Sequence, residues 1–207
     1  MASGTYAWVV PGDSCPPSDT KPKYQYAIVS KIVEDREEIE AIHRATQYLQ
    51  TVKNWESVLI HPFYSCAPSK DQTIFLMQQG TPLHTYLKKP LPDRAHLYEA
   101  VRTCLLNYSA IFHTGQNDLH GDIQVDNIVL LEDGTARLID YNPYTRLATS
   151  VTIVSEKLRM TEVLIEILGL PGYKRHDTTL LHKSFSEIVK QRDMLINMTS
   201  TVKTLLF

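Results

Sequence analysis

The chain has 207 residues, which is long enough to bury a core in one domain or in two small lobes. A formal net charge of -2 argues against a nucleic-acid-binding surface as its main function. The sequence has no run of about 18 apolar residues, so it predicts no membrane span. The N-terminus shows no basic region followed by an apolar stretch, so we expect no secretory signal.

The cysteines indicate the redox state of the protein. Cys15, Cys66 and Cys104 form no C-x-x-C motif, and their number is odd. This pattern is typical of reduced thiols, so we predict free cysteines and a cytoplasmic protein. The first of them lies in a polar, proline-rich stretch from Pro11 to Pro22, which predicts a mobile loop.

A strand and a helix are predicted next along the chain. β-Branched residues over 26–33 predict a strand, in which Val29 and Lys31 share one face because they are two residues apart. Residues 34–52 then predict a helix. Its apolar stripe consists of Ile39, Ile42, Ala45 and Leu49.

The middle of the chain predicts two more strands and a long helix. The strands are expected over 57–60 and 73–77, and Gln78-Gln79-Gly80 then breaks the pattern. Helical spacing follows at Leu83, Tyr86 and Leu87. A longer helix is expected from Asp93, near its N-cap, to about His113. Its apolar stripe consists of Leu97, Ala100, Val101, Cys104 and Leu105.

The most informative stretch carries four polar residues, His120, Asp122, Asn127 and Asp140. Two apolar runs separated by a Glu-Asp-Gly turn lie between Asn127 and Asp140, and they predict a β-hairpin. The hairpin would bring both side chains to one end of a two-stranded ribbon. An amide oxygen and a carboxylate placed together suit a hard cation such as Mg²⁺, and Asp122 can accept a proton or orient a hydroxyl.

This pattern resembles the protein kinase catalytic loop, H-R-D-x-x-x-x-N, followed by D-F-G. The matching residues are His120-Gly121-Asp122 through Asn127, and then Asp140-Tyr141-Asn142. The resemblance implies that Asp122 orients the acceptor hydroxyl, and that Asn127 and Asp140 hold Mg²⁺. It also implies that His120 braces the loop and that Tyr141 packs in the core. The His-Gly-Asp string is equally similar to kinases of aminoglycosides and choline.

The resemblance extends to the nucleotide-binding strand. The strand of Val29 and Lys31 is similar to the kinase V-A-I-K strand, which implies that Val29 covers the adenine and that Lys31 reaches the phosphates. A helix carboxylate should hold this lysine, and both Glu38 and Glu40 are candidates. Ala2 to Val9 resembles the glycine-rich loop but keeps only Gly4, so we expect weak phosphate binding there, with Val9 against the adenine.

The hinge between the lobes would follow the strand at 73–77. The resemblance implies that backbone groups of Gln78 and Gln79 bind the adenine edge. It further implies that Met77 lies behind the adenine and that Val129 lies against it. A strand is missing before the glycine-rich loop, so a protein partner could complete the N-lobe.

Departures from the family pattern limit the expected activity. Gly121 replaces the arginine that docks a phosphorylated activation loop, so control by such a phosphate is not expected. Gln124 replaces the lysine that stabilises the transferring phosphoryl group. Residues 155–168 resemble the large central helix of the family, with Glu156 in place of the aspartate that ties down the catalytic loop. No A-P-E motif follows Asp140, so the usual peptide platform is absent.

The sequence therefore predicts an α+β, bilobal kinase-like fold. The N-lobe would span residues 1–79, with strands and one helix, and the mainly helical C-lobe would span 80–207. The expected function is ATP- and Mg²⁺-dependent transfer to Ser or Thr of a protein. The alternatives are a pseudokinase that acts as a binding or inhibitory module, and a small-molecule kinase. The chain thus resembles the reduced kinases found among viral and bacterial-effector proteins. If it is such a protein, we expect it in the host cytoplasm.

Overall fold

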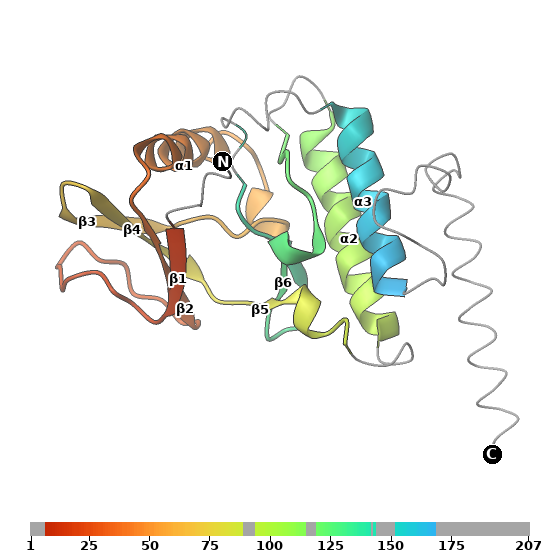
Figure 1. The fold of residues 1–207 in the computed structure, drawn as a ribbon, viewed down its shortest axis with the longest axis horizontal. Coiled ribbons are helices and arrows are strands. Elements are labelled where there is room, and N and C mark those ends of the chain that lie inside the picture. The colour runs from red at the N-terminus through yellow and green to blue at the C-terminus, as the bar shows by residue number, and fades with distance from the viewer. Residues whose placement is uncertain (1–6, 89–93, 115–118, 142, 144–151, 169–207) are drawn as a thin grey trace, which may run out of the picture.

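The structure, a computed structural model, describes residues 7–88, 94–114, 119–141, 143 and 152–168. Within them the fold is mixed α/β, with two antiparallel sheets and three α-helices (Figure 1). The strands and helices are β1 (Ala7–Pro11), β2 (Ile28–Val33), α1 (Arg36–Leu49), β3 (Tyr64–Ser69), β4 (Gln72–Gln78), β5 (Thr81–Pro82), α2 (Ala95–Phe112), β6 (Ile128–Leu130), β7 (Ala136–Leu138) and α3 (Ile153–Leu168). The predicted α+β class is confirmed at this level.

The first sheet has the strand order β1-β2-β4-β3, and α1 packs on one of its faces. The helix begins after Asp35, whose carboxylate accepts hydrogen bonds from the backbone N–H groups of Glu37 (2.7 Å) and Glu38 (3.2 Å). Its apolar stripe meets the sheet, where Ile42 packs against β2 and β4. The predicted strand at 26–33 and helix at 34–52 are confirmed, with shorter bounds.

The segment between β1 and β2 covers the opposite face of this sheet. Cys15 is buried there against Ile28, Ile74 and Leu76. It forms a disulfide with Cys66 of β3, so the prediction of three reduced thiols was wrong. The cysteines therefore no longer support a cytoplasmic location, which stays a prediction.

Polar contacts also hold this segment in place. The Ser30 hydroxyl accepts a hydrogen bond from the Ser14 N–H (2.9 Å) and donates one to the Gly12 carbonyl (2.8 Å). Asp13 forms an ion pair with Lys21. The disulfide and these contacts attach the predicted loop at 11–22 to the sheet, and its mobility stays a prediction.

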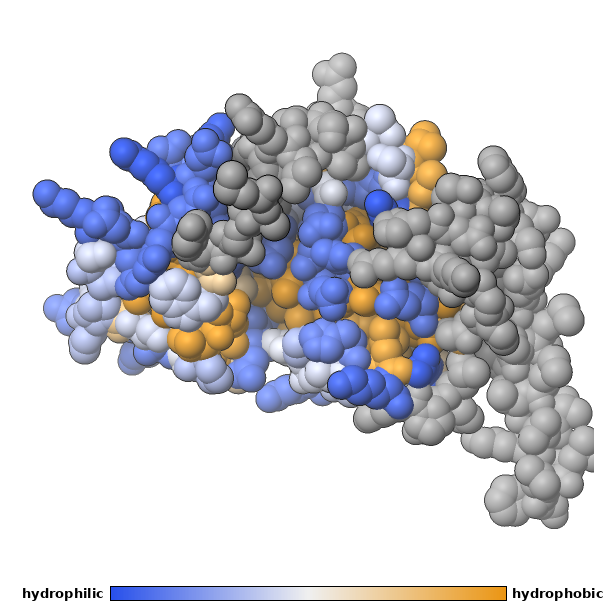
Figure 2. Space-filling view, in the orientation of Figure 1, coloured by the Kyte–Doolittle hydropathy of each residue, from blue (hydrophilic) through white to orange (hydrophobic). Residues whose placement is uncertain are grey.

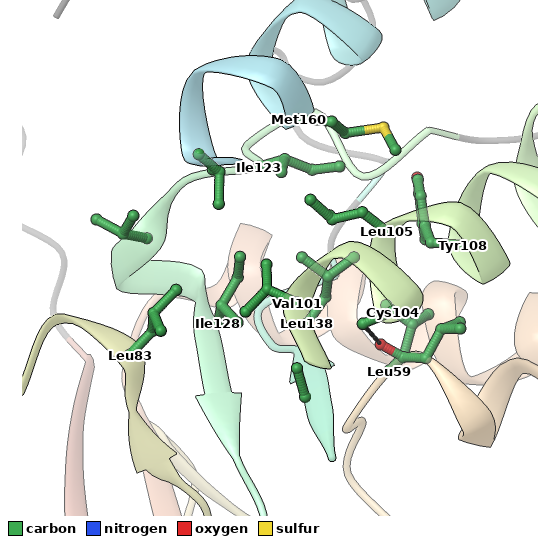
Figure 3. Packing of buried hydrophobic residues seen from close by; sticks show 14 of the residues in the cluster. Leu59, Leu83, Val101, Cys104, Leu105, Tyr108, Ile123, Ile128, Leu138 and Met160 are labelled. Atoms are coloured by element: carbon green, nitrogen blue, oxygen red, sulfur yellow. Dashed lines mark hydrogen bonds between the residues drawn. The ribbon is translucent and has the colours of Figure 1, made fainter. Parts of the chain in front are cut away.

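The second sheet, β5-β6-β7, packs with α2 and α3 around the largest apolar core. Figure 3 shows side chains from α2 and from the hairpin strands meeting in this core. The predicted hairpin and long helix are confirmed, although Asp93 lies outside the described residues. No helix in the described part of the chain is long and apolar enough to cross a membrane.

Two predictions in the middle of the chain were wrong. The expected strand at 57–60 is a 3₁₀ turn at Trp55–Ser57 followed by a single parallel bridge from Leu59 to Leu138. Leu59 therefore pairs with a hairpin strand, but the pairing is too short to form a strand of the sheet. Helical spacing after Gly80 produces only the 3₁₀ turn Leu83–Thr85. Strand β3 was not predicted, since its exposed residues and Pro68 are typical of an edge strand.

Gly80 joins the two sheets at a point of close approach. A Cβ added to this glycine would lie 2.6 Å from Cγ2 of Val129 and 3.3 Å from the carbonyl of Leu130. Such distances are below van der Waals contact, so only glycine fits between β4 and β6. The glycine therefore allows strand β6 of the second sheet to approach the end of β4 in the first sheet closely.

Candidate functional site

Lys31 of β2 connects three separate segments of the chain. Its Nζ lies 2.9 Å from Oε1 of Glu38 in α1 and 2.8 Å from Oδ1 of Asp140, which is 109 residues away in sequence. Glu40, the other candidate carboxylate, is exposed and lies near Arg36 and Arg44 instead. The structure therefore identifies Glu38 as the helix carboxylate that holds Lys31.

The two carboxylates keep the lysine charged. Burial alone would lower the pKa of the Lys31 ammonium, but the charges of Asp140 and Glu38 outweigh this effect and hold the pKa above its usual value. The charged group lies in a partly enclosed position, where its electrostatic interactions are stronger than in bulk water. A fixed, charged lysine of this kind can bind phosphate oxygens.

A cavity of about 320 Å³ opens beside this group. Four of the predicted site residues line it, namely Val9, Lys31, Met77 and Asp140. The roof is β1, whose apolar surface is exposed in Figure 2 and whose Val9 is 56% exposed. The volume lies at the lower end of the range for small-molecule sites, and the lining combines apolar and charged side chains as such sites do.

The other predicted adenine-binding residues do not line this cavity. Val29 and Val129 pack in one apolar cluster with Met77, Ile60 and neighbouring side chains, which closes the space between the two sheets. Gln79 donates its backbone N–H to the carbonyl of Ala27 (2.8 Å), and Gln78 ends β4. Gly4 lies outside the described residues. The structure thus places Lys31 and Asp140, the phosphate side of the predicted site, at the cavity, whereas Val29 and Val129 pack in the apolar cluster beside it.

Asn127 and Asp140 lie at the same end of the hairpin, whereas a meeting of their side chains at one cation stays a prediction. The N–H of Ile139 donates a hydrogen bond to the carbonyl of Asn127 (2.9 Å). Asp140 is the next residue after this backbone hydrogen bond between the two sides of the hairpin. The backbone of Asp140 has a φ of 59°, in the left-handed region that few non-glycine residues adopt. Strain of this kind is concentrated at functional sites, and here it accompanies the turn of Asp140 toward Lys31.

Asp122 lies exposed in the loop before β6. Its Oδ2 accepts hydrogen bonds from the amides of Asn127 (2.8 Å) and Gln124 (3.0 Å). Asn127 also donates to the backbone carbonyl of Asp122 (2.8 Å). These bonds fix the Asp122 carboxylate. Both bonds from Asn127 use its amide nitrogen and not its side-chain oxygen, which is the atom that a hard cation binds.

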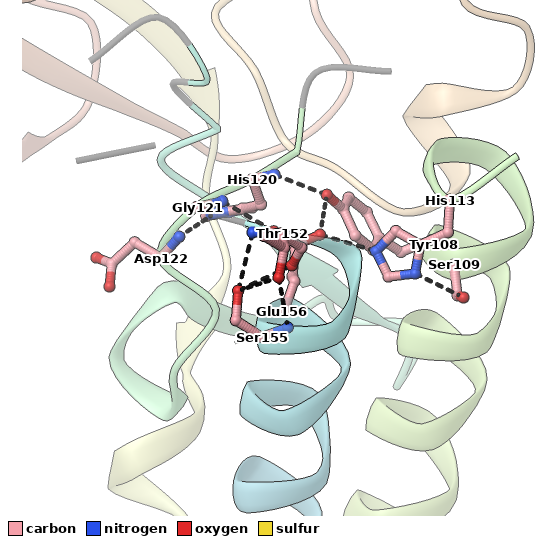
Figure 4. A network of polar contacts seen from close by, with 9 residues as sticks. All are labelled: Tyr108, Ser109, His113, His120, Gly121, Asp122, Thr152, Ser155 and Glu156. Atoms are coloured by element: carbon pink, nitrogen blue, oxygen red, sulfur yellow. Dashed lines mark hydrogen bonds and ion pairs between the residues drawn. The ribbon is translucent and has the colours of Figure 1, made fainter. Parts of the chain in front are cut away.

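Glu156 of α3 holds the loop from below (Figure 4). Its buried carboxylate accepts hydrogen bonds from the Gly121 N–H (2.8 Å), the Tyr108 hydroxyl (3.0 Å) and the His113 Nε2 (2.8 Å). The side chain is only 1% exposed, so three donors compensate for its desolvation. The expectation that Glu156 ties down this loop agrees with these contacts.

His120 braces the loop against the hairpin. Its Nε2 donates to the carbonyl of Ile139 (2.8 Å), while its Nδ1 accepts from the N–H of Asp122 (3.3 Å). Burial lowers the pKa of the imidazole, which favours the neutral ring that this pair of bonds requires. Tyr141 packs beside it and is 1% exposed, as predicted.

Sequence reasoning missed two residues of this network. Tyr108 accepts a hydrogen bond from the His120 N–H (2.8 Å) and donates to Glu156, and His113 pairs with the same carboxylate. Tyr108 occupies a position on the buried side of α2, where a hydroxyl must find a partner. That requirement was the available signal, but the sequence could not name the partner.

His61 lies at the back of the cavity. Its Nε2 is 2.8 Å from the hydroxyl of Thr46, and its ring meets Trp55 edge-on. Burial lowers the pKa of His61 from 6.5 to about 4. The folded protein therefore keeps this ring neutral at a pH where the unfolded chain already binds a proton.

This difference predicts acid sensitivity. As the pH falls from 6.5 toward 4, only the unfolded state takes up the His61 proton, so folding should lose up to about 3 kcal/mol. In urea unfolding at several pH values, the variant His61→Gln should lose correspondingly less stability over this range. The exposed His84 is the control, and His84→Gln should follow the wild type. Parallel curves for wild type and His61→Gln would contradict the prediction.

Comparison with known proteins adds no family assignment. No protein-family model matches the chain, and no curated protein sequence is significantly similar to it. In the described residues, no group of three or more His, Cys, Asp and Glu side chains could hold a metal ion. The site must therefore be interpreted from its own geometry.

Proposed function

We propose that the protein is a reduced, bilobal kinase-like phosphotransferase that uses ATP and Mg²⁺. The observation that carries this proposal is the position of Lys31, whose Nζ joins Glu38 and Asp140 at a cavity. Three charges from three segments serve no evident packing role. Together they suit a polyphosphate and its counter-ion.

Each residue of the site would have a separate role in the transfer. Lys31 would bind phosphate oxygens, with Glu38 fixing its position. Asp122 would accept a hydrogen bond from the acceptor hydroxyl and take its proton as transfer proceeds. Glu156 and His120 would keep the loop in place through backbone contacts. The acceptor we favour is Ser or Thr of a protein.

Asn127 and Asp140 fit a magnesium ion. Asp140 offers a carboxylate and Asn127 an amide oxygen at the same end of the hairpin. Two protein ligands are few, but Mg²⁺ keeps several waters and takes others from substrate phosphates. When bound, the ion would offset phosphate charge, a task that the neutral Gln124 cannot perform.

A second candidate function is a pseudokinase, which would bind partners without transferring phosphate. The apolar cluster of Val29, Met77 and Val129 favours it, because Val29 and Val129, which the resemblance places against adenine, pack against other side chains and do not line the cavity. The hydrogen bond from Gln124 to Oδ2 of Asp122 also supports it, since this oxygen then has less capacity to accept a hydrogen bond from an acceptor hydroxyl.

Titration with ATP, with and without Mg²⁺, tests the proposal. Mg²⁺ should raise the affinity for ATP about tenfold in the wild type, and Asp140→Asn should abolish this coupling. The control Asp71→Asn makes the same charge change in an exposed turn and should behave as wild type.

Labelled ATP then separates the alternatives. Transfer to a protein hydroxyl supports the protein kinase, and transfer to an aminoglycoside or a choline-like alcohol alone supports the small-molecule kinase. ATP binding without transfer supports the pseudokinase. Failure to bind ATP in either condition would overturn the nucleotide-dependent proposal.

A further inference from the structure

We propose that the Cys15–Cys66 disulfide is a redox-sensitive latch that holds β1 over the cavity. This inference goes beyond the phosphotransferase proposal, and only its consequence for ATP affinity rests on that proposal. It assigns a role to a covalent bond that the candidate reaction does not use.

The latch connects the two edges of the first sheet. In the order β1-β2-β4-β3, strands β1 and β3 lie at opposite edges. Cys15 follows the end of β1 by four residues, and Cys66 lies in β3. The bond between them lies on the sheet face opposite α1, where Cys15 packs against Ile74 and Leu76. It ties the segment after β1 to a strand 51 residues away in the sequence.

β1 is an exposed edge strand, and the disulfide adds a covalent tie to the hydrogen bonds that hold the segment after it. The strand has five residues, pairs with β2 alone, and exposes Trp8 and Val9 to 44% and 56%. Exposed edge strands open at low free-energy cost. Since Trp8 and Val9 line the cavity beside Lys31, fraying of β1 would remove the roof of the site.

Thiol–disulfide exchange can open the latch. The thiolate of a low-molecular-weight thiol would attack Sγ of Cys66, which is partly exposed, whereas Cys15 is buried. The S–S bond breaks, a mixed disulfide forms on Cys66, and Cys15 leaves as a thiolate that takes up a proton. A second thiol then attacks the small-molecule sulfur and releases the Cys66 thiol. The protein gains two electrons, and two thiols become one disulfide.

Cys104 takes no part in this exchange. It is buried in the core around α2, and burial raises the pKa of its thiol to about 12. Its thiol lies 3.5 Å from the carbonyl of Val58, far along the chain from the latch. The variant Cys104→Ala is therefore a suitable control.

Hydrogen exchange tests the latch directly. Reduction with dithiothreitol should speed exchange of the Trp8 and Val10 amides about tenfold, while amides of α2 stay unchanged. The double variant with Cys15→Ser and Cys66→Ser should resemble the reduced protein and ignore the reductant. Cys104→Ala should respond as the wild type does. Unchanged exchange in β1 on reduction, or three titratable thiols in the air-oxidised protein, would overturn the latch.

The same samples separate this inference from the proposed function. ATP should bind about fivefold more weakly to the reduced protein if the roof contributes to affinity. Equal affinity in both states, with faster β1 exchange, would overturn the link between latch and cavity. Faster exchange with no ATP binding in either state would support the latch and contradict the phosphotransferase.

Discussion

Replacing Asp122 with asparagine is expected to lower the rate of phosphoryl transfer about a thousandfold, because the loop then lacks a group that can take the acceptor proton. The affinity for ATP should stay unchanged, since Lys31 and Asp140 lie on other segments. Asp122 is exposed, so the substitution should leave stability near that of the wild type. Single-turnover kinetics with saturating ATP measure the chemical step.

Asp126 provides a matched control for this experiment. It lies in the same loop, is exposed, and its carboxylate is 3.4 Å from Nδ1 of His84. Asp126→Asn should transfer phosphate at the wild-type rate. If Asp122→Asn is as active as Asp126→Asn, Asp122 does not take the proton, and another group must be sought.

Local patterns predicted much of the fold. The hairpin around its Glu-Asp-Gly turn and the helix α2 were both found from periodicity, because their apolar residues face one core and their ends carry turn or polar residues. The polar residues of the loop were found from their spacing. Since β-hairpin register is fixed by the turn, the position of Asn127 and Asp140 at one end of the hairpin followed from the sequence.

Contacts between distant segments could not be predicted in the same way. Both Glu38 and Glu40 lie on the helix after Lys31, and only the rotation of α1 against the sheet selects Glu38. Three cysteines allow three pairings, and nothing in their spacing favours Cys15 with Cys66. The close approach of Val129 to Gly80 likewise depends on how two sheets meet.

Two clusters of carboxylates hold the candidate site. Glu38 and Asp140 fix Lys31 near the first sheet, and Glu156 of α3 fixes the loop that carries Asp122. The second cluster is the more deeply buried, so its disruption should have the larger effect on folding.

Replacing Glu156 with alanine is expected to lower the free energy of unfolding by about 3 kcal/mol or more. The change leaves the Gly121 N–H, the Tyr108 hydroxyl and His113 without their shared acceptor in a buried place. A loss of this size should lower the melting temperature by about 10 °C. Urea unfolding and thermal melting measure both quantities.

Glu162 on the same helix is the control, because its carboxylate pairs with Arg159 (2.7 Å), whose side chain is 49% exposed. Glu162→Ala should cost less than about 1 kcal/mol. Glu156→Gln should lie between the two, since an amide keeps one acceptor oxygen but places an NH₂ group against donors. In this variant, hydrogen exchange at Gly121 should rise while that of β1 stays unchanged. Equal costs for Glu156→Ala and Glu162→Ala would mean that the network does not stabilise the loop.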